Sequence, residues 1–190
     1  WTVEAVSDQL SHLADTILNQ TLQHTWRQMP KKHRDEPAFA IIGYGKLGGK
    51  ELGYTSDLDL VYLFDDPDQE AGQTYARLSN RLTTWLSGST AAGTLYDIDL
   101  RLRPNGDDGF PVHSTAAFDK YQHENAWTWE HQSLTRARFV CGDPDIGRQF
   151  EDTRRRILRL RRDPDTLRRE ILAMREKITA AHPPLPTDIK

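Results

Sequence analysis

The most constraining feature of this 190-residue chain is a glycine-rich segment that leads into a strand opening with two aspartates. Residues 43–59 read Gly-Tyr-Gly-Lys-Leu-Gly-Gly-Lys-Glu-Leu-Gly-Tyr-Thr-Ser-Asp-Leu-Asp. Apolar runs on either side, at 38–42 and 58–64, predict buried strands. We therefore expect a strand, a tight loop and a second strand, with Asp57 and Asp59 where the second strand begins.

The two aspartates predict a metal site. Asp57 and Asp59 are two positions apart, so the alternation along a strand places both side chains on one face. They repel each other unless a cation lies between them, and Mg²⁺ prefers one or two carboxylates together with phosphate oxygens. With Asp99 as a third acid, two Mg²⁺ ions can be held, one activating the attacking oxygen and one neutralising the leaving phosphate.

Asp99 lies in a segment, 94–103, in which apolar and charged residues alternate, and this pattern predicts a third strand with one charged face. Arg101 and Arg103 share that face, where they can meet phosphate or balance the acids. The alternative is that they form surface ion pairs of little consequence. Asp97 is expected to be a solvated partner of Arg101.

Glycines allow backbone amides to approach a phosphate chain without an intervening side chain, and Lys46 and Lys50 add positive charge to this segment. The segment is not a Walker A loop, and it lacks the third glycine of a dinucleotide fingerprint. The candidate nucleotide-binding residues are Gly48, Gly49, Ser56, Lys46, Arg101 and Arg103.

The remaining periodicity predicts helices around this small sheet. Val6, Leu10, Leu13 and Ile17, continued by Leu22 and Trp26, mark a long amphipathic helix that Pro30 ends. A second helix closes near Gly88, a helix capped by Ser114 runs through Tyr121, and a tryptophan-bearing helix covers 125–138. The pairs Asp143-Pro144 and Asp163-Pro164 open helices near 144–160 and 164–181.

The fold class expected is α+β, a small mixed sheet with flanking helices followed by a helical lobe. We divide the chain into an N-terminal helix (1–30), an α/β core (31–112) and the lobe (113–190). With 37% hydrophobic residues the chain can bury a real core. It begins at Trp1 without a methionine and stops after a proline-rich stretch, so we expect an excised domain truncated at its C-terminus.

Composition excludes several classes of protein. A net charge of −3 argues against a nucleic-acid binder. No apolar run is long enough to span a membrane and no secretory signal is recognisable, so the expected location is the cytoplasm, with no membrane partner. The single cysteine, Cys141, rules out an internal disulfide and is expected to be a structural thiol.

Residues 43–60 and 96–104 resemble the nucleotidyltransferase domains of the glutamine-synthetase adenylyltransferase/adenylyl-removing enzymes, members of the polymerase-beta-like superfamily. The similarity runs from about 39 to 143. Residues 125–138, Asn-Ala-Trp-Thr-Trp-Glu-His-Gln-Ser-Leu-Thr-Arg-Ala-Arg, are similar to the C-terminal, adenylylating domain rather than the N-terminal, deadenylylating one. Fewer residues separate Gly49 from Asp57 than is usual in the superfamily, and the named family shares this shortness.

The resemblance implies the polymerase-beta-like nucleotidyltransferase fold and the transfer of AMP from ATP to a tyrosine hydroxyl of glutamine synthetase. Pyrophosphate is released, and the modification regulates nitrogen assimilation. Asp57 and Asp59 match the metal-binding pair, Asp99 matches the third acid and helps to deprotonate the tyrosine, and Gly48 and Gly49 match the phosphate-approach glycines. In the full-length enzyme, PII signalling protein and glutamine are implied as regulators.

Several alternatives remain open at this stage. The paralogous domain removes AMP by phosphorolysis with the same three acids, and a fragment or regulatory module could bind nucleotide, glutamine or PII without catalysis. The segment from Trp127 to His131 could be an adenine shelf, although tryptophans at helical spacing usually belong to a core. The basic segment from Arg154 to Arg169 predicts a solvated helix face, or else a docking surface for an acidic partner.

Overall fold

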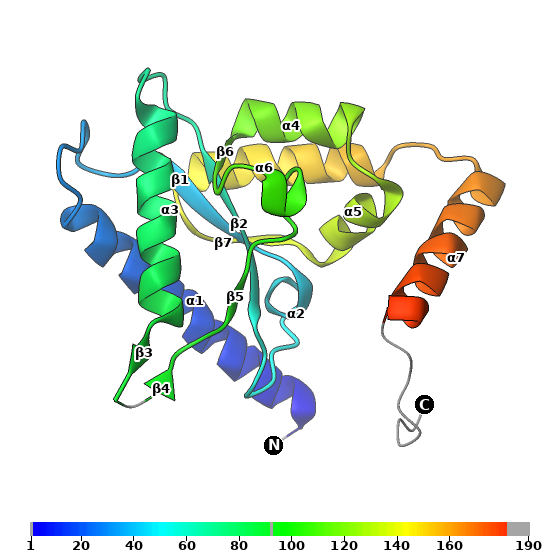
Figure 1. Cartoon of the computed structure of the whole chain (residues 1–190), viewed down its shortest axis with the longest axis horizontal. Helices are drawn as coiled ribbons and strands as arrows, with labels where there is room; N and C mark the ends of the chain where they lie inside the picture. Colours follow the sequence, from blue (N-terminus) through cyan, green and yellow to red (C-terminus); the bar gives the residue numbers. More distant parts are fainter. Residues whose placement is uncertain (1, 92, 182–190) are drawn as a thin grey trace.

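A mixed β-sheet forms the centre of the computed structural model, which describes residues 2–91 and 93–181 (Figure 1). In the described chain its strands follow the order β5-β2-β1-β7, and β6 also pairs with β2. β1 is antiparallel to β2 and β7, whereas β5 and β6 run parallel to β2. The strands span Phe39–Gly43 (β1), Leu58–Phe64 (β2), Ile98–Asp99 (β5), His113–Ser114 (β6) and Arg138–Gly142 (β7).

Helices cover the sheet, so the expected α+β class with a small mixed sheet is confirmed. Figure 1 shows α1 and α3 together at one side of the sheet and α4 and α6 together at the other, with α7 beyond α5. The elements are α1 (Val3–Arg27), α2 (Gly45–Gly48), α3 (Ala71–Ser87), α4 (Thr115–Glu124), α5 (Thr128–Ser133), α6 (Pro144–Leu158) and α7 (Pro164–Ala181), the 3₁₀ turns η1 (Gly106–Asp108) and η2 (Leu134–Arg136), and a hairpin of β3 (Ser89–Thr90) and β4 (Gly93–Thr94).

Local capping chemistry explains where the later helices begin. The Ser114 hydroxyl accepts a bond of 3.1 Å from the main chain of Ala117 at the start of α4. At the start of α6 and α7, the carboxylates of Asp143 and Asp163 accept bonds of 2.8 Å from main-chain N–H groups, and a proline occupies the first helical position. The helices expected at these caps are confirmed.

The apolar run of β1 is buried along its whole length because β1 lies between β2 and β7 and helices cover it. Its first residue, Phe39, packs with Tyr75 of α3 at a ring-centroid distance of 5.8 Å. Trp26 of α1 also stacks on Tyr75, again at 5.8 Å. Aromatic packing on Tyr75 therefore joins α1 and α3 to the sheet.

The N-terminal helix is confirmed, but the residues predicted for its buried face are partly wrong. Leu22 and Trp26 are buried as predicted, but Leu13 is exposed, and the fully buried Ala14 and Leu18 are not among the predicted positions. Ser11 is buried as well, and its hydroxyl is satisfied by the carbonyl of Ser7 at 2.8 Å. The buried face is thus shifted from the predicted one and overlaps with it, since Leu10 and Ile17 are partly buried against the core. Small side chains at this face let α1 pack against α3 and β7.

The continuous strand predicted over 94–103 is wrong. Thr94 ends the β3–β4 hairpin, Ile98–Asp99 alone pair with β2, and the chain then turns. The cause is Arg103, whose guanidinium donates to the carbonyls of Leu100 at 2.7 Å, Asp107 at 3.2 Å and Gly109 at 3.3 Å. These bonds stabilise a loop in place of a strand ladder.

The helix predicted over 125–138 is also wrong in its second half. α5 ends at Ser133, the 3₁₀ turn η2 follows, and Arg138–Gly142 form β7, an edge strand on β1. A five-residue strand embedded in helical signals has no local signature, because pairing with β1 creates it. Cys141 lies buried in this strand, and burial raises the pKa of its thiol to about 12, which keeps it neutral.

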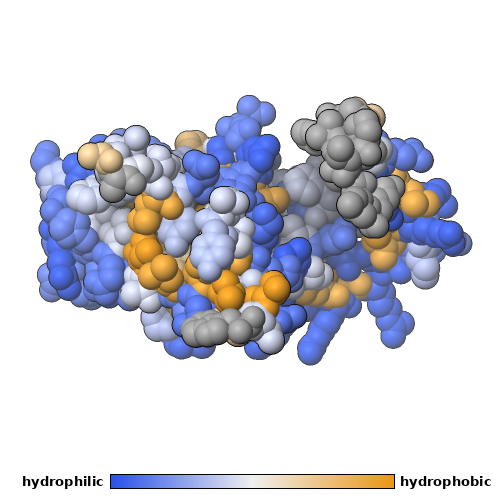
Figure 2. All heavy atoms as spheres, turned by 90° about the horizontal axis from the view of Figure 1, so that it is seen from below, coloured by the Kyte–Doolittle hydropathy of each residue, from blue (hydrophilic) through white to orange (hydrophobic). Residues whose placement is uncertain are grey.

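Within the described residues, no helix is both long enough and apolar enough to cross a bilayer. Large apolar side chains do reach the surface, among them Tyr54, Trp85 and Leu95. Figure 2 views the molecule from below and shows apolar patches in the middle of that face, flanked by hydrophilic residues at both ends.

A buried carboxylate joins the connector after α1 to the sheet. Asp66 follows β2, and its side chain is only 3% exposed. Its Oδ2 accepts from the Tyr75 hydroxyl at 2.8 Å and from Arg34 at 3.0 Å, and it lies 2.8 Å from His33 Nε2. The Tyr75 oxygen in turn accepts from the main chain of Ala38 at 3.0 Å. Asp66 therefore connects the segment after α1, the end of β2 and α3.

Asp66→Asn should lower the free energy of unfolding by about 2–4 kcal/mol at pH 7, because it leaves the buried Tyr75 hydroxyl and the Arg34 guanidinium without a charged acceptor. Burial raises the Asp66 pKa, but hydrogen bonds from His33, the Asp68 main chain, Tyr75 and Arg34 outweigh it and hold that pKa well below its usual range. The stabilisation is complete above the ordinary aspartate pKa and is lost as the pH falls through the lowered native value.

Urea denaturation from pH 7 downward measures this effect, with Asp65→Asn as the matched control. Asp65 is exposed and accepts one bond of 2.7 Å from Gln149, so its substitution should cost less than about 1 kcal/mol. The difference between wild type and Asp66→Asn should shrink in acid. Equal losses for the two variants would contradict this account.

Candidate functional site

Three aspartates meet where β2 and β5 begin their parallel pairing. Asp59 of β2 lies opposite Asp99 of β5, and Asp57 immediately precedes β2. Each of the three carboxylates offers an oxygen atom, and these atoms all lie within 4.8 Å of one another. The structure therefore brings together acids that are 40 residues apart in the chain, in the arrangement expected from the sequence.

The three acids differ in their electrostatic environments. Burial raises the pKa of Asp59, and the neighbouring charges of Asp57 and Asp99 raise it further, while Lys46 and Arg101 oppose the rise. Asp99 shows the reverse, since hydrogen bonds from Arg101 hold its pKa below the usual range. The cluster thus retains uncompensated negative charge at Asp59.

Arg101 lies across Asp99 in a forked contact. Its Nε donates to Asp99 Oδ2 at 2.9 Å and its main-chain N–H donates to Oδ1 at 2.8 Å. The expected pairing of Arg101 with Asp97 is therefore wrong, because the turn after β5 brings the guanidinium back onto the nearer carboxylate. The Arg101 side chain is exposed, so it remains accessible from the cleft.

The donor set suits Mg²⁺. A cleft of about 440 Å³ opens beside the cluster, lined by Asp57, Asp97, Ile98, Asp99, Leu100, Arg101, Arg103 and Asp107. Three partly buried carboxylates supply hard oxygen ligands, and the open side leaves room for the phosphate oxygens and water that Mg²⁺ retains. Asp57, Asp59 and Asp99 are the residues that could hold the ion.

The glycine segment folds as one short helical turn, α2, against Asp59. Gly45 adopts φ = +52°, and a Cβ there would lie 2.1 Å from Asp59 Oδ2. The main-chain N–H of Tyr44 donates to the carbonyl of Asp59 at 2.9 Å. Gly45 is one of the glycines predicted to let the main chain approach a phosphate, but its contact with the Asp59 carboxylate was not predicted. It belongs to the glycine pattern, but nothing in that pattern shows that it faces the carboxylate.

The other candidates in this segment lie around α2. Lys46 is exposed on α2, and its charge acts on Asp59. Gly48 packs so closely under Arg136 that a Cβ would lie 2.0 Å from the Arg136 carbonyl oxygen, while Gly49 is exposed. Ser56 accepts from the Gly53 main chain at 3.0 Å, which closes the turn that precedes Asp57. Direct phosphate contacts of these residues remain predictions.

Arg103 forms hydrogen bonds that hold the loop after β5. Its three bonds to loop carbonyls engage the guanidinium, although the residue also lines the cleft. The predicted phosphate contact of Arg103 would have to compete with these bonds. Arg101, whose partner is an acid of the cluster itself, is the better placed of the two cations.

The tryptophans expected in the core are exposed. Trp127 is 69% exposed and Trp129 is partly exposed. Glu130 is buried and accepts from the Tyr121 hydroxyl and from the Trp127 main chain, both at 2.8 Å, while His131 Nε2 lies 2.8 Å from the carbonyl of Gln122. Glu130 and His131 therefore tie α5 to α4, outside the acid cluster.

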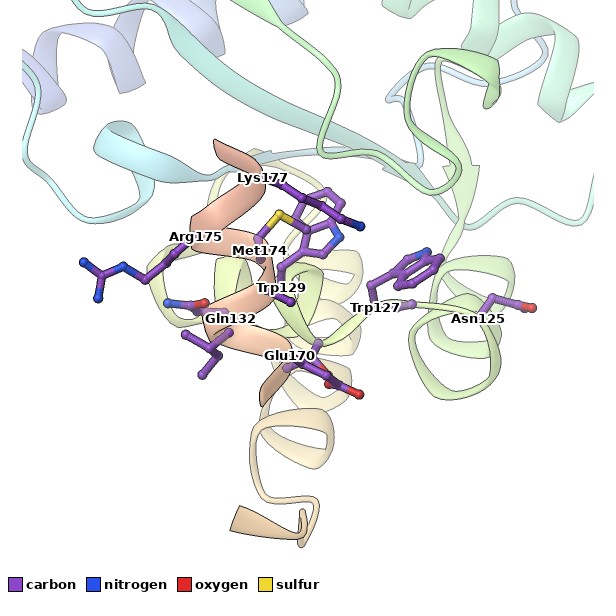
Figure 3. A pocket seen from close by; sticks show the side chains of 12 residues that line it. Asn125, Trp127, Trp129, Gln132, Glu170, Met174, Arg175 and Lys177 are labelled. Carbon is purple, nitrogen blue, oxygen red and sulfur yellow. The ribbon is translucent and has the colours of Figure 1, made fainter. Parts of the chain in front are cut away.

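A separate cavity of about 630 Å³ lies between α5 and α7. Trp129 lines it together with Met174 and Lys177, and Trp127 lies between Trp129 and Asn125 (Figure 3). The two tryptophans also line a hollow of about 540 Å³ that reaches Arg101. The tryptophan segment thus borders the site on the Arg101 side.

Arginines of the basic segment form internal contacts in addition to any solvated face. Arg154 donates to the carbonyl of Leu134 at 2.7 Å, Arg156 pairs with Asp119 of α4, and Arg162 Nη2 lies 2.9 Å from His131 Nδ1. These three side chains connect α6 and the following loop to α4, α5 and η2. The sequence pattern predicts a solvated face, but these three side chains form contacts within the protein.

The sequence is similar to that of known proteins. The family described as GlnE, glutamate-ammonia ligase adenylyltransferase, matches residues 1–153. A relative from Neisseria meningitidis serogroup A is 65% identical over 190 residues, and one from Chromobacterium violaceum is 57% identical over 190 residues. Both are named bifunctional glutamine synthetase adenylyltransferase/adenylyl-removing enzyme. The match covers 100% of this chain but 21% of each relative, so the chain spans about a fifth of their length.

Gly45→Ala should disturb the acid cluster. The left-handed conformation would cost about 1–2 kcal/mol, and the new methyl group would displace the Asp59 carboxylate. We expect Mn²⁺, used as a paramagnetic substitute for Mg²⁺, to bind about 10–100-fold more weakly by electron paramagnetic resonance. Gly53→Ala is the control, because its Cβ would meet only Ser56 Oγ at 3.6 Å. Unchanged Mn²⁺ affinity in Gly45→Ala would count against the site.

Asp59→Asn should raise the unfolding midpoint of the cation-free protein at pH 7. The pKa of Asp59 is raised in the native state, so its ionised form destabilises the fold above its ordinary pKa, and the amide removes that repulsion. The gain should vanish in acid, where the carboxyl is protonated in both states. Thermal unfolding with EDTA measures it, and a lower midpoint for the variant at pH 7 would refute the repulsion.

Proposed function

Because the chain belongs to the glutamate-ammonia ligase adenylyltransferase family, we propose that its acid cluster transfers AMP from ATP to a tyrosine hydroxyl of glutamine synthetase. The observation that carries the proposal is the convergence of Asp57, Asp59 and Asp99 beside the glycine segment. The names of the relatives supply glutamine synthetase as the protein acted on.

The arrangement of the sheet supports a polymerase-beta-like nucleotidyltransferase fold. A glycine turn connects two antiparallel strands, the second strand opens with the aspartate pair, and a parallel neighbour carries the third acid. In this proposal residues 31–112 supply the acids and the glycine segment, following the N-terminal helix of residues 1–30. The lobe of residues 113–190 adds β7 and the wall that bears Trp127.

The reaction forms a bond between the tyrosine oxygen and the α-phosphorus of ATP, breaks the bond from that phosphorus to the bridging oxygen, and releases pyrophosphate. Asp57, Asp59 and Asp99 would hold Mg²⁺, which when bound activates the attacking oxygen and neutralises charge on the leaving phosphate. Lys46 adds a cation beside Asp59, and the short α2 turn leaves main-chain groups open to the phosphates.

Asp99 receives the proton that the tyrosine loses. At rest the forked contact with Arg101 keeps Asp99 ionised and makes it a weak base. The exposed Arg101 guanidinium can turn from the carboxylate to a phosphate oxygen, which is a strong bidentate acceptor. That exchange would leave an Asp99 oxygen free to take the proton when nucleotide is present.

The direction proposed is attachment of AMP, because residues 125–138 resemble the adenylylating domain. The names of the relatives also include an adenylyl-removing activity, so phosphorolytic removal of AMP is the second candidate. We propose a cytoplasmic enzyme in which PII protein and glutamine act on the full-length chain.

Asp57→Asn and Asp59→Asn should each reduce transfer of labelled AMP from α-³²P-ATP to unmodified glutamine synthetase in the presence of Mg²⁺. The loss should be about 10²–10³-fold, as when one group that stabilises transition-state charge is removed. Asp97→Asn is the matched control, because Asp97 lines the same cleft outside the three-acid cluster. Its activity should remain within a few-fold of wild type.

Transfer that survives both cluster substitutions would refute the mechanism. Release of ADP from adenylylated glutamine synthetase and phosphate, without forward transfer, would instead identify the removing activity. Binding of ATP with neither reaction would identify a regulatory module.

A further inference from the structure

Arg136 lies over the glycine segment although it is far from it in the sequence. Its carbonyl oxygen would be 2.0 Å from a Cβ on Gly48, and its Nε would be 3.1 Å from a Cβ on Gly49. Both the main chain and the side chain of Arg136 therefore cover the end of α2. Sequence reasoning gave this arginine no role at the site, because only the tertiary fold brings η2 onto α2.

The Arg136 guanidinium is held by an exposed acid. It pairs with Glu51, and the two side chains are 46% and 60% exposed. A pair of this kind contributes about 0–1 kcal/mol and is readily exchanged for a better acceptor. Arg138, two residues later, is different: it donates to Asp15 at 2.7 Å and to the Leu47 carbonyl at 3.2 Å, and it is mostly buried.

The position of Arg136 relative to the acids fits a polyphosphate. α2 begins at Gly45, which contacts Asp59, and ends at Gly48, beside Arg136. Four residues of helix separate Gly45 from Gly49 by about 6 Å, within reach of linked phosphate groups. A chain of phosphates that starts at the acids and follows α2 would reach the guanidinium with its outer end. The guanidinium pairs more strongly with a phosphate group than with an exposed carboxylate such as Glu51.

We infer that Arg136 binds the outer phosphates of the nucleotide, and that Glu51 holds its guanidinium while the site is free of nucleotide. This inference rests on the proposed function, since it places the α-phosphate at Asp57 and Asp59. The leaving pyrophosphate is then neutralised by a residue of the lobe, so the lobe contributes directly to nucleotide binding.

Titration calorimetry with Mg²⁺-ATP, without glutamine synthetase, tests the inference by binding alone. Arg136→Ala should weaken ATP binding about tenfold or more, because a charge-assisted bond to phosphate is lost. Arg136→Lys should retain part of the affinity. Glu51→Gln should tighten ATP binding by roughly two- to fivefold, because the competing carboxylate is gone. AMP, which lacks the outer phosphates, should bind wild type and Arg136→Ala equally.

The matched control is Arg155→Ala. Arg155 forms a similarly exposed pair with Asp152 at 3.6 Å, and its removal should leave ATP affinity unchanged. Unfolding midpoints of every variant separate binding losses from loss of fold.

Unchanged ATP affinity in Arg136→Ala would overturn the inference. Equal weakening of ATP binding in Arg136→Ala and Glu51→Gln would also overturn it, because the pair would then be a structural contact. Equal loss of AMP and ATP binding in Arg136→Ala would overturn it as well. The proposed function fails in a different way: wild type would bind ATP but would neither transfer AMP to glutamine synthetase nor remove it. A wild type that does not bind Mg²⁺-ATP would overturn the inference as well.

Discussion

The parallel pairing of β2 with β5 is the interaction on which the rest of the site depends. It is short, with Leu58 opposite Ile98 and Asp59 opposite Asp99, and the Leu58 N–H donates to the Asp97 carbonyl at 2.9 Å. Without it the third carboxylate would lie on a loop that has no fixed relation to the other two. The loop bonds of Arg103 limit β5 to two residues, so the strand ends at Asp99, beside the cleft.

This pairing gathers like charges, and the surrounding structure is organised around the repulsion that results. Arg101 neutralises Asp99, whereas Asp59 keeps a raised pKa because it is partly buried between two other carboxylates. Gly45 leaves space for the Asp59 side chain where any Cβ would collide with it. Repulsion among the carboxylates lowers the stability of the fold, and the same negative charge favours the binding of cations.

The lobe is integrated with the core through more than one contact. β7 extends the sheet beside β1, η2 covers α2 through Arg136, and Trp127 borders the hollow that reaches Arg101. The acids and the nucleotide-facing groups therefore come from segments on both sides of residue 112. The chain spans about a fifth of the length of its relatives, and residues from both the core and the lobe surround the site.

The sequence by itself determined the elements that have a local signature: the buried run of β1, the strand β2 with its aspartate pair, and the helices that begin at Ser114, Asp143 and Asp163. Alternation and capping depend on neighbours within a few residues, so they can be read directly from the chain. The tertiary structure alone decided that β7 is a strand, that β5 is short, that Trp127 is exposed, and that Gly45 and Arg136 meet the site. Each of these depends on a partner distant in the chain, and no local pattern carries information about such a partner.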